Sequence, residues 1–344
     1  MATANARFTM ARHSLMQMAV ALLLLTGNCK FPQKTKMKTF EWYPTTSAPK
    51  EYPVRLLSAS LHLADGGLVG IQPKAMIANG WGELGAVSLV GEDLKTLPAE
   101  LEVQWFSYTE RKCYGGRFKL DQGKLTEEFQ KKMIAPATDA PAVFTHLVIG
   151  FAPKGGISLW FNGEGGTKEV SHFTAAEVQF DMQAIIGTYP NVEVYATDVI
   201  ARNRPAGSVK MSGHTADDFM KWSGRYRQDY RWHWAITATV PTRGVLAHYF
   251  NGEEYYWPQT PEKATSFTHP LPDAVTVRWG DGSDSGSKTL HFDDAELFAA
   301  FDKLGGAGKE AGILLELNRV TRTGKTFVQN ETSIIELKNT KFSD

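Results

Sequence analysis

The feature that most constrains the fold of this chain is an internal repeat. The segments "LPAELEVQWFS" (Leu97–Ser107) and "LPDAVTVRWGD" (Leu271–Asp281) share Leu-Pro, a valine and a tryptophan at the same spacing. A second pair, "THLVIGFAPKGGISLWFNGE" (Thr145–Glu164) and "WAITATVPTRGVLAHYFNGE" (Trp234–Glu253), shares an alternating run, a proline, a glycine turn and Phe-Asn-Gly-Glu. Alternation rich in β-branched and aromatic residues indicates strands. The sequence therefore predicts a duplicated, strand-rich body.

The two matching pairs occur in opposite order along the chain, so a simple tandem repeat does not put both in register. Aligning Val54–Glu83 with Trp234–Glu253 gives each half the same order: hairpin, Leu-Pro strand, helix and closing strands. We therefore expect a first half at residues 51–188 and a second half at residues 225–344. Residues 189–224 connect them, with one further strand predicted at "VEVYATDVI". In this alignment the second Phe-Asn-Gly-Glu match is a local likeness between hairpins.

Two helices are expected among the strands. "DDAELFAAFDKLGG" has Asp293 at the N-cap position, Glu296 three residues later and a terminal glycine, which predicts a helix. "LTEEFQKKM" (Leu125–Met133) is its shorter counterpart. The expected fold class is α+β and strand-dominated, with two related halves of antiparallel sheet and a helix packed on each. The positions predicted to face the core are Val103, Trp105, Leu147, Ile149, Phe151, Val275, Val277 and Trp279.

Residues 1–29 have the layout of an export signal. Arg7 and Arg12 precede the apolar run Ala19–Leu25, and no acidic residue occurs in this segment. The apolar run is too short to span a bilayer, which takes about 20 residues. The signal is also complete if translation starts at Met10.

Cys29 directly follows this signal. "LLTGNC" is similar to the lipobox of bacterial lipoproteins, whose cysteine is acylated, although Asn28 stands where Gly, Ala or Ser is usual. Lipidation at Cys29 is the favoured prediction, and a soluble exported protein and an uncleaved anchor are the alternatives. Lys30 in place of an aspartate favours anchoring to the outer membrane, with the body in the periplasm. The Lys- and Pro-rich residues 30–50 are expected to form an extended tether.

Charge and cysteine content narrow the class of protein. Residues 1–29 hold two of the 37 Lys and Arg and none of the 37 Asp and Glu, so the mature chain has a net charge near −2. This gives no reason to expect nucleic-acid binding, which depends on positive charge. Beyond Cys29 the chain has only Cys113, so no intramolecular disulfide is expected. We expect Cys113 to be a buried, unreactive thiol.

No pattern typical of catalysis or metal binding stands out. A hydrolase elbow reads G-x-S-x-G, but "GSDSG" (Gly282–Gly286) has Asp284 at the serine position. A calcium loop starting at Asp281 would need glutamate at its twelfth position, where Phe292 stands. "GGAGKEAG" lacks the spacing of a phosphate loop, and the histidines lack zinc-ligand spacing. The sequence thus predicts no catalytic residues, no metal and no cofactor.

Two segments are candidates for binding a partner. "RYRQDYRWHW" (Arg225–Trp234), taken as one extended strand, places basic residues on one face and aromatic residues on the other. The basic face is either a docking surface or the charged protection of an edge strand. "EEYYW" (residues 253–257) suits sugar binding, general acid chemistry or a solvated loop. The candidate partner-binding residues are Arg225, Arg227, Arg231, His233, Tyr255, Tyr256 and Trp257.

Several motifs together resemble a family of bacterial lipoproteins known as domain of unknown function 2931. They are "NGWGE", "LPAELEVQWFSYTERKCYGGRF", "GFAPKGGISLWFNG" and "YFNGEEYYW". The resemblance extends over roughly residues 42–335, with Cys113 at a position where an aromatic residue is more usual. Some members are encoded beside type VI secretion effectors, including phospholipases, and look like immunity proteins. No catalytic residues are known for the family.

The expected function is therefore non-catalytic. The resemblance implies a periplasmic lipoprotein that binds and neutralises a secreted toxic effector, with a type VI phospholipase as the candidate. The alternative is a cell-envelope scaffold or glycan-binding lipoprotein that uses exposed aromatic residues. A third hypothesis is that the protein is a hydrolase, which the absence of a recognisable nucleophile–base or metal motif in the sequence disfavours. The expected partners are an effector protein and, through the lipid anchor, a membrane.

Overall fold

Strands make up most of the structure, in agreement with the alternating sequence. The computed structural model describes residues 37–87, 91–203, 224–238, 242–258, 266–280, 285–318 and 323–343. The export signal, Cys29 and the first part of the expected tether lie outside the described residues. From Lys38 onward the chain belongs to a single unit, and the sections below concern that unit.

The described part of the first half contains the α-helices α2, α3 and α4, strands of two large sheets, and two small two-stranded sheets, β1-β6 and β9-β10. Its elements are β1 (Phe40–Glu41), β2 (Tyr43–Ser47), β3 (Val54–Leu63), β4 (Leu68–Ile71), β5 (Lys74–Ile77), β6 (Leu94–Lys95), β7 (Pro98–Ser107), β8 (Lys112–Lys119), α2 (Gln122–Phe129), β9 (Met133–Ile134), β10 (Pro141–Ala142), β11 (Phe144–Ala152), η1 (Pro153–Gly155), β12 (Gly156–Gly163), β13 (Gly166–Thr174), β14 (Ala176–Glu177), α3 (Met182–Ile186) and α4 (Val192–Arg202). One sheet has the order β14-β8-β7-β3-β4, with β5 paired to β3. Strands β2, β11, β12 and β13 begin a nine-stranded sheet.

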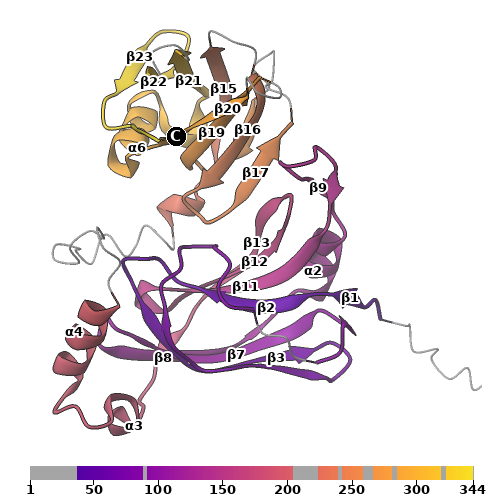
Figure 1. The fold of residues 1–344 in the computed structure, drawn as a ribbon, viewed down its shortest axis with the longest axis vertical. Helices are drawn as coiled ribbons and strands as arrows, with labels where there is room; N and C mark the ends of the chain where they lie inside the picture. The colour runs from indigo at the N-terminus through magenta and orange to yellow at the C-terminus, as the bar shows by residue number, and fades with distance from the viewer. Residues whose placement is uncertain are drawn as a thin grey trace, which may run out of the picture. The chain divides into compact units, whose positions relative to one another are not determined.

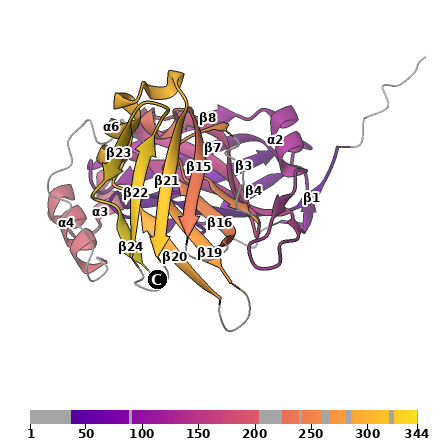
Figure 2. The same ribbon diagram turned by 90° about the horizontal axis from the view of Figure 1, so that it is seen from above.

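The second half follows the same plan. Its elements are η2 (Arg225–Arg227), β15 (Tyr230–Ala238), β16 (Thr242–Tyr249), β17 (Glu254–Trp257), β18 (Phe267–His269), β19 (Pro272–Trp279), β20 (Gly286–His291), α6 (Asp294–Lys303), η4 (Gly306–Gly308), β21 (Ala311–Asn318), β22 (Thr323–Gln329), β23 (Ile334–Leu337) and β24 (Lys341–Ser343). Strands β17, β16, β19, β20 and β24 complete the nine-stranded sheet. Strands β16, β17, β19 and β20 are labelled in Figure 1, and β24 is labelled in Figure 2. Strands β18, β15, β21, β22 and β23 form a separate sheet, of which β15, β21, β22 and β23 are seen side by side in Figure 2.

The two halves share one strand order. In each half a strand near the start pairs in parallel with a long strand that comes after the capped helix, β2 with β11 and β15 with β21. The intervening strands form a hairpin sheet, β8-β7-β3-β4 in one half and β20-β19-β16-β17 in the other. The last strand of each half returns to the hairpin sheet, β14 beside β8 and β24 beside β20. The prediction of two related halves, each with a helix, is confirmed.

The two Leu-Pro strands are equivalent residue by residue. In β7 the Ala99 carbonyl accepts a hydrogen bond from Leu120 N at 2.9 Å. In β19 the Asp273 carbonyl accepts the same bond from Phe292 N at 2.8 Å. Counted from Leu-Pro, Ala99 and Asp273 are at the same place in the repeat. The second half therefore carries an acid where the first half carries alanine.

Helices α2 and α6 start in the same way. Asp121 and Asp293 are their N-caps, and each accepts a hydrogen bond from the backbone N–H three residues later. Four residues after each cap, Leu125 and Leu297 are fully buried. The prediction at Asp293 is confirmed, whereas the helix expected over Leu125–Met133 in fact begins and ends earlier. Among the helices in the described ranges, none combines the length and apolarity needed to cross a bilayer.

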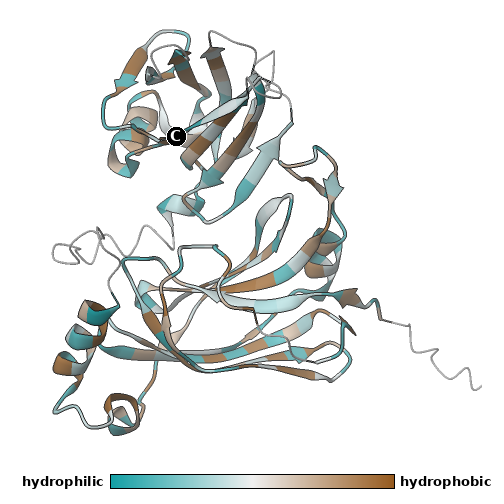
Figure 3. Cartoon of the chain, in the orientation of Figure 1, coloured by the Kyte–Doolittle hydropathy of each residue, from teal (hydrophilic) through white to brown (hydrophobic). Residues whose placement is uncertain are grey.

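Each half has its own cluster of buried apolar side chains. Figure 3 shows hydrophobic and hydrophilic residues following one another along the strands that contribute to these clusters. A third cluster, around Phe106, Cys113 and Tyr195, joins α3 and α4 to the outer face of β7 and β8. Trp279, at the last residue of β19, is only partly buried, contrary to expectation. The other predicted core positions are all 0 % exposed: Val103, Trp105, Leu147, Ile149, Phe151, Val275 and Val277.

The strand predicted at "VEVYATDVI" is wrong, because this segment forms helix α4. Asn191 caps the helix by accepting a hydrogen bond from Val194 N at 3.0 Å. Tyr195 and Ala196 are buried, and Val199 packs against the same cluster. Burial at helical spacing on a packed surface outweighs the strand preference of the β-branched residues.

The prediction of an extended tether over residues 30–50 is wrong for the C-terminal part of this segment, which the structure describes. There β2 (Tyr43–Ser47) is a largely buried strand. Thr45, Thr46 and Ser47 are at most 1 % exposed. Their polarity suggested solvation, but their hydroxyls are satisfied inside the protein. Ser47 Oγ, for example, accepts a hydrogen bond from Gly82 N at 2.9 Å. The first half therefore begins at β2 rather than at residue 51.

The alignment of Val54–Glu83 with Trp234–Glu253 is shifted by one strand. By topology β3 corresponds to β16, and Trp234 belongs to β15, the counterpart of β2. The first Phe-Asn-Gly-Glu motif lies at the end of β12 and the second follows β16, and these are not equivalent strands. Their match is thus a local likeness, as expected.

Candidate binding site at the junction of the two halves

The second Phe-Asn-Gly-Glu motif lies where the two halves meet. The Asn251 carbonyl accepts a hydrogen bond from Trp160 Nε1 at 3.1 Å, which joins the β16–β17 turn to β12. Gly82, at φ +78°, lies so close to this turn that a Cβ would be 2.3 Å from the Gly252 carbonyl oxygen. Beside the turn β13 pairs with β17, so one sheet runs through both halves.

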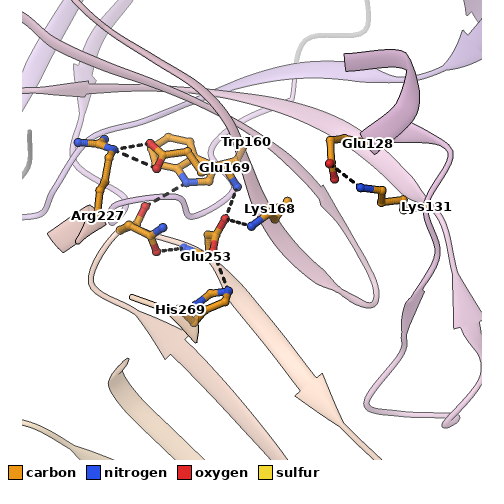
Figure 4. A network of polar contacts seen from close by, with 9 residues as sticks. Glu128, Lys131, Trp160, Lys168, Glu169, Arg227, Glu253 and His269 are labelled. Carbon is orange, nitrogen blue, oxygen red and sulfur yellow. Dashed lines mark hydrogen bonds and ion pairs between the residues drawn. The ribbon is translucent and has the colours of Figure 1, made fainter. Parts of the chain in front are cut away.

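Glu253 is the centre of a charge network at this junction (Figure 4). Its side chain is 5 % exposed, and its Oε1 lies 2.8 Å from Lys168 Nζ. The same oxygen accepts a hydrogen bond from Glu169 N at 2.9 Å. Its Oε2 lies 3.2 Å from His269 Nε2. A carboxylate of the second half is thus held by two consecutive residues of β13 in the first half.

A second buried ion pair lies beside the first. Arg227 Nε donates to both carboxylate oxygens of Glu169, at 2.9 and 3.0 Å, and the guanidinium also donates to Ser158. The two side chains are 13 % and 9 % exposed. Burial raises the pKa of Glu169, and the Arg227 guanidinium opposes this rise only in part. Removing one partner of such a pair leaves the other charge buried, which costs several kcal/mol.

A partly open cavity of 450 Å³ lies beside this network, and both halves line it. We call it the junction cavity. Its volume falls in the range of about 300–1,000 Å³ that is typical of ligand sites. The first half contributes Lys50, residues 81–84, Asn162 and Thr167, and the second half contributes His248, Tyr249, Gly252, Glu253, Glu254, Asp273, Ala274 and His291.

Acidic and imidazole groups of the second half line the junction cavity. His248 Nδ1 lies 3.0 Å from a carboxylate oxygen of Glu254. Burial opposes protonation of His248, but Glu254, helped by Asp273 and Glu83, outweighs burial and raises the pKa of the imidazole. The raised pKa favours an ion pair between His248 and Glu254 near neutral pH.

Asp273 is the least satisfied of these groups. Among the described residues its Oδ1, which is buried, has no hydrogen-bond partner. Burial raises the pKa of the carboxyl, although the nearby imidazoles of His248 and His291 and two backbone N–H groups act in the opposite direction. Asp273 is therefore a residue of the junction cavity that also holds a buried acceptor atom without a partner among the described residues.

The basic segment Arg225–Trp234 is not one strand, contrary to prediction. Residues 225–227 form the η2 turn, and β15 starts three residues later. Arg227 belongs to the buried network already described. Arg225 pairs with Asp302, with 2.5 Å between the charged atoms, and its guanidinium lies 4.6 Å from the Phe298 ring centre. Both arginines thus bind other parts of the same chain.

Arg231 and His233 share one partner on the surface of β15. Arg231 Nε lies 3.2 Å and His233 Nδ1 lies 3.3 Å from the carboxylate of Glu310. The reading of this segment as an edge strand is wrong, because β15 has β18 on one side and β21 on the other. The aromatic face packs inward as expected, with buried Tyr230, Trp232 and Trp234.

Tyr255, Tyr256 and Trp257 do not share one surface. Tyr256 is 2 % exposed and donates a hydrogen bond to Asp139 Oδ1 at 2.8 Å, so it is not accessible to a partner. Tyr255 is 41 % exposed. Its ring centre lies 4.6 Å from that of the partly buried Trp257. Of these three candidates, Tyr255 is the one available at the surface.

Sequence reasoning did not identify the junction cavity. His248, Asp273 and His291 are far apart in the sequence and come together because β16, β19 and β20 are neighbours in one sheet. One signal was present: the acid at position 273 interrupts a repeat that has Ala99 at the same place. Within the described ranges, no group of three or more His, Cys, Asp or Glu is placed to hold a metal ion.

Cys113 lies away from the junction. It is 4 % exposed, as expected for a buried thiol. Burial, together with the charge of Glu177, raises the pKa of the thiol to about 11. Such a thiol is protonated at neutral pH, and the thiolate is the reactive form.

Comparison with known proteins places the chain in a family. Residues 30–203 match the model of a family described as protein of unknown function (DUF2931). The match includes the first half and ends before the second, so the resemblance expected to reach residue 335 is established only to residue 203. No curated protein and no solved structure matches the chain. Since the matched segment is half of the 344 residues, the chain belongs to the DUF2931 family of proteins of unknown function.

Proposed function

We propose that this chain is a non-catalytic lipoprotein that binds and neutralises a secreted toxic effector protein in the periplasm. In this proposal Cys29 is acylated and holds the body at the outer membrane. The candidate effector is a type VI phospholipase, which would meet its lipid substrate in the same compartment. The protein acts by binding the effector and blocking its active site.

The observation that carries this proposal is the buried coupling of the two halves. The shared nine-stranded sheet, the Trp160–Asn251 hydrogen bond and the network around Glu253 favour a single arrangement of both halves. A preorganised surface loses less conformational entropy on binding, which favours high affinity. Tight protein inhibitors characteristically move little when they bind. The junction cavity adds a concave, polar recess to such a surface.

The test is protection of cells from the protein encoded by the adjacent reading frame. We expect export of that protein to the periplasm to stop growth, and co-expression of the full-length chain to restore it. The two proteins should form a complex with a dissociation constant in the nanomolar range or below. A chain that neither protects cells nor binds the effector would rule out this function.

The anchor is tested separately with Cys29→Ser. We expect the wild-type chain to incorporate labelled fatty acid and to fractionate with the outer membrane. The variant should carry no label and should leave the membrane fraction. A variant that is still processed and retained would rule out lipidation at Cys29 and leave the binding proposal intact.

The exposed Tyr255 supports a second candidate function, a glycan-binding envelope lipoprotein. An exposed aromatic ring beside another, here 4.6 Å from Trp257, offers a surface on which a sugar ring can lie. Sedimentation with purified peptidoglycan separates the two functions. Binding that is lost in Tyr255→Ala would favour the glycan function, and no binding by the wild-type chain would exclude it.

A further inference from the structure

The joint between the two halves uses two strand edges, and each edge has a counterpart elsewhere in the chain. At the joint the start of β13 pairs with the start of β17, Gly166 with Tyr255 and Thr167 with Glu254. By strand order β23 is the counterpart of β13, and β4 is the counterpart of β17. Among the described strands, β23 pairs with β22 alone and β4 pairs with β3 alone. The chain therefore repeats both edges of its own joint, and the repeated edges have no partner strand.

The correspondence between β4 and β17 holds residue by residue. The turn before β4 is closed by a hydrogen bond from Leu63 N to the Gly67 carbonyl at 2.8 Å. The turn before β17 is closed by the same bond, from Tyr249 N to the Glu253 carbonyl at 2.9 Å. The next residue in each half starts the strand, so Leu68 takes the place that Glu254 has at the joint.

Both unpaired edges carry an aliphatic side chain on the face turned away from the core. Leu68 is 61 % exposed, and Ile334, the first residue of β23, is 57 % exposed. Their neighbours Val69 and Ile335 pack against the apolar cores, and successive side chains of a strand point to opposite faces. A pairing of β4 with β23 that copies the joint therefore places Leu68 beside Ile334 and removes both from water.

Neither edge carries the usual protection of an exposed strand. Edge strands of monomeric proteins are commonly protected by lysine, by proline or by a bulge. β4 reads Leu-Val-Gly-Ile, with no charge and no proline. β23 reads Ile-Ile-Glu-Leu, and its one charged residue, Glu336, lies 3.6 Å from Lys325 of the neighbouring strand. Both edges therefore suit the addition of another strand.

We propose that the β23 edge of one molecule pairs with the β4 edge of a second copy of this chain, in the antiparallel manner of β13 and β17. Because the two edges differ, every copy that is added leaves one edge of each kind unpaired. The contact therefore builds head-to-tail rows of molecules instead of closed dimers. This inference concerns the chain and its own copies, and it does not depend on the proposed neutralisation of an effector.

The contact between copies is weaker than the joint within one chain. At the joint Glu253 is held by Lys168 and His269. Its counterpart, the residue before Leu68, is Gly67, which has no side chain to form such a network. Strand pairing and burial of the two aliphatic side chains remain. Small interfaces of this kind are transient, so we expect a dissociation constant of about 10–100 μM.

Cross-linking tests which edges meet. The experiment uses the full-length chain with Cys29→Ser, so that no acyl group drives association. Leu68→Cys and Ile334→Cys are introduced into two separate chains, which are treated with a short bismaleimide cross-linker alone and as a mixture. We expect a cross-linked dimer only in the mixture. A chain with both substitutions should give a ladder of dimers, trimers and longer species on a denaturing gel.

The matched control is Val194→Cys, whose side chain is 45 % exposed on α4, away from both edges. Mixed with either edge variant, it should give no dimer. The parent chain, in which buried Cys113 is the remaining thiol, measures background cross-linking.

Sedimentation equilibrium tests the strength of the contact. The mean mass of the parent chain should rise with concentration around the expected dissociation constant. Leu68→Lys and Ile334→Lys each place a charge against an aliphatic side chain and should weaken association at least about tenfold. Because both positions are more than half exposed, the variants should fold, which circular dichroism checks. Val194→Lys should associate like the parent.

Three outcomes would overturn the inference. Dimers formed by one edge variant alone would indicate a two-fold contact between like edges. A parent chain that stays monomeric at every concentration and gives no dimer in the mixture would show that the edges do not pair. Association that neither lysine variant weakens would place the contact on another surface.

Discussion

The two hairpin sheets are equivalent in topology and differ in what packs against them outside the cores. In the first half, Phe106 and Cys113 on this face lie in an apolar cluster with α3 and α4. In the second half His248, Asp273 and His291 lie around the junction cavity, at the other end of the hairpin sheet, where the first half has His62, Ala99 and Lys119. The inward faces, by contrast, keep one apolar pattern in both halves. The two halves therefore keep the same apolar residues where their sheets face the cores, and they differ in the side chains on the outward faces of the hairpin sheets.

The largest expected effect tests whether the two halves are one cooperative unit. Glu169→Gln removes the carboxylate that accepts both hydrogen bonds from Arg227 Nε and neutralises one side of this buried ion pair. We expect a loss of about 3–5 kcal/mol in the free energy of unfolding, measured by urea denaturation. The control is Glu177→Gln, whose pair with Lys112 is half-exposed and should matter little. Equal effects of the two variants would mean that the buried pair does not couple the halves.

A slightly smaller effect tests the equivalence of the two cores. Leu125 and Leu297 are both 0 % exposed and hold the same place after their N-caps. We expect Leu125→Ala and Leu297→Ala to lower the free energy of unfolding by about 2–5 kcal/mol each, because each leaves a cavity in its core. Both losses should appear in one transition followed by circular dichroism. Two separate transitions, each moved by one variant, would show that the halves unfold independently.

A gain of stability is expected where the second half departs from the first. Asp273→Ala restores the residue of the first half and removes a carboxyl whose pKa is raised by burial. Ionisation of that carboxyl destabilises the folded state, so its cost is absent below the unfolded pKa of about 3.9 and grows as pH rises through the folded pKa. We expect the variant to be more stable by about 1–3 kcal/mol at pH 7.

At pH 3 the same substitution should change stability much less, because Asp273 is then protonated in both states. Thermal unfolding at the two pH values measures the difference. A gain of the same size at both would show that the charge of Asp273 is not responsible. A loss at pH 7 would show that the carboxylate has a stabilising partner.

The smallest effect concerns the covered face of the first half. Cys113 has a pKa raised to about 11 and lies beneath α3 and α4. In a chain that carries Cys29→Ser, so that Cys113 is the remaining thiol, we expect a thiol reagent at pH 7 to label the folded protein far more slowly than the protein unfolded in urea. Cys113→Ser is the control for labelling at other groups. Rapid labelling of the folded chain would mean that the two helices do not cover this face as described.

Sequence patterns predicted the parts of the fold that repeat locally. Alternation located the buried faces of β7, β11 and β19, and an aspartate before an apolar helical pattern located α6. They failed where tertiary contacts decide. Thr45 and Ser47 look solvent-exposed by composition, but they are buried because backbone groups of a distant loop satisfy their hydroxyls. Val192 and Val194 favour a strand intrinsically, yet an Asn191 cap and burial of Tyr195 make this segment helical.

The candidate site was harder to predict for the same reason. His248 and Asp273 are brought together by the pairing of β16 with β19, and residues 81–84 of the first half line the same cavity. A single sequence contains no spacing rule for such a meeting. Arg225 and Arg227 stood out as a basic run, but the fold pairs them with acids that are far away in the chain.

The joint between β13 and β17 unites two strands that are not counterparts of one another. When two repeats contact each other through different surfaces, each repeat keeps one of these two surfaces unpaired. In a two-fold symmetric contact both repeats use the same surface, and none is left over. Here the spare copies are β4, the counterpart of β17, and β23, the counterpart of β13; in the described structure both lie at the ends of their sheets. Each presents an aliphatic side chain to water, Leu68 at 61 % and Ile334 at 57 % exposure. The duplication thus pairs the edges of β13 and β17 with each other. It leaves the edges of their counterparts, β23 and β4, at the ends of their sheets, where an unpaired edge favours self-association.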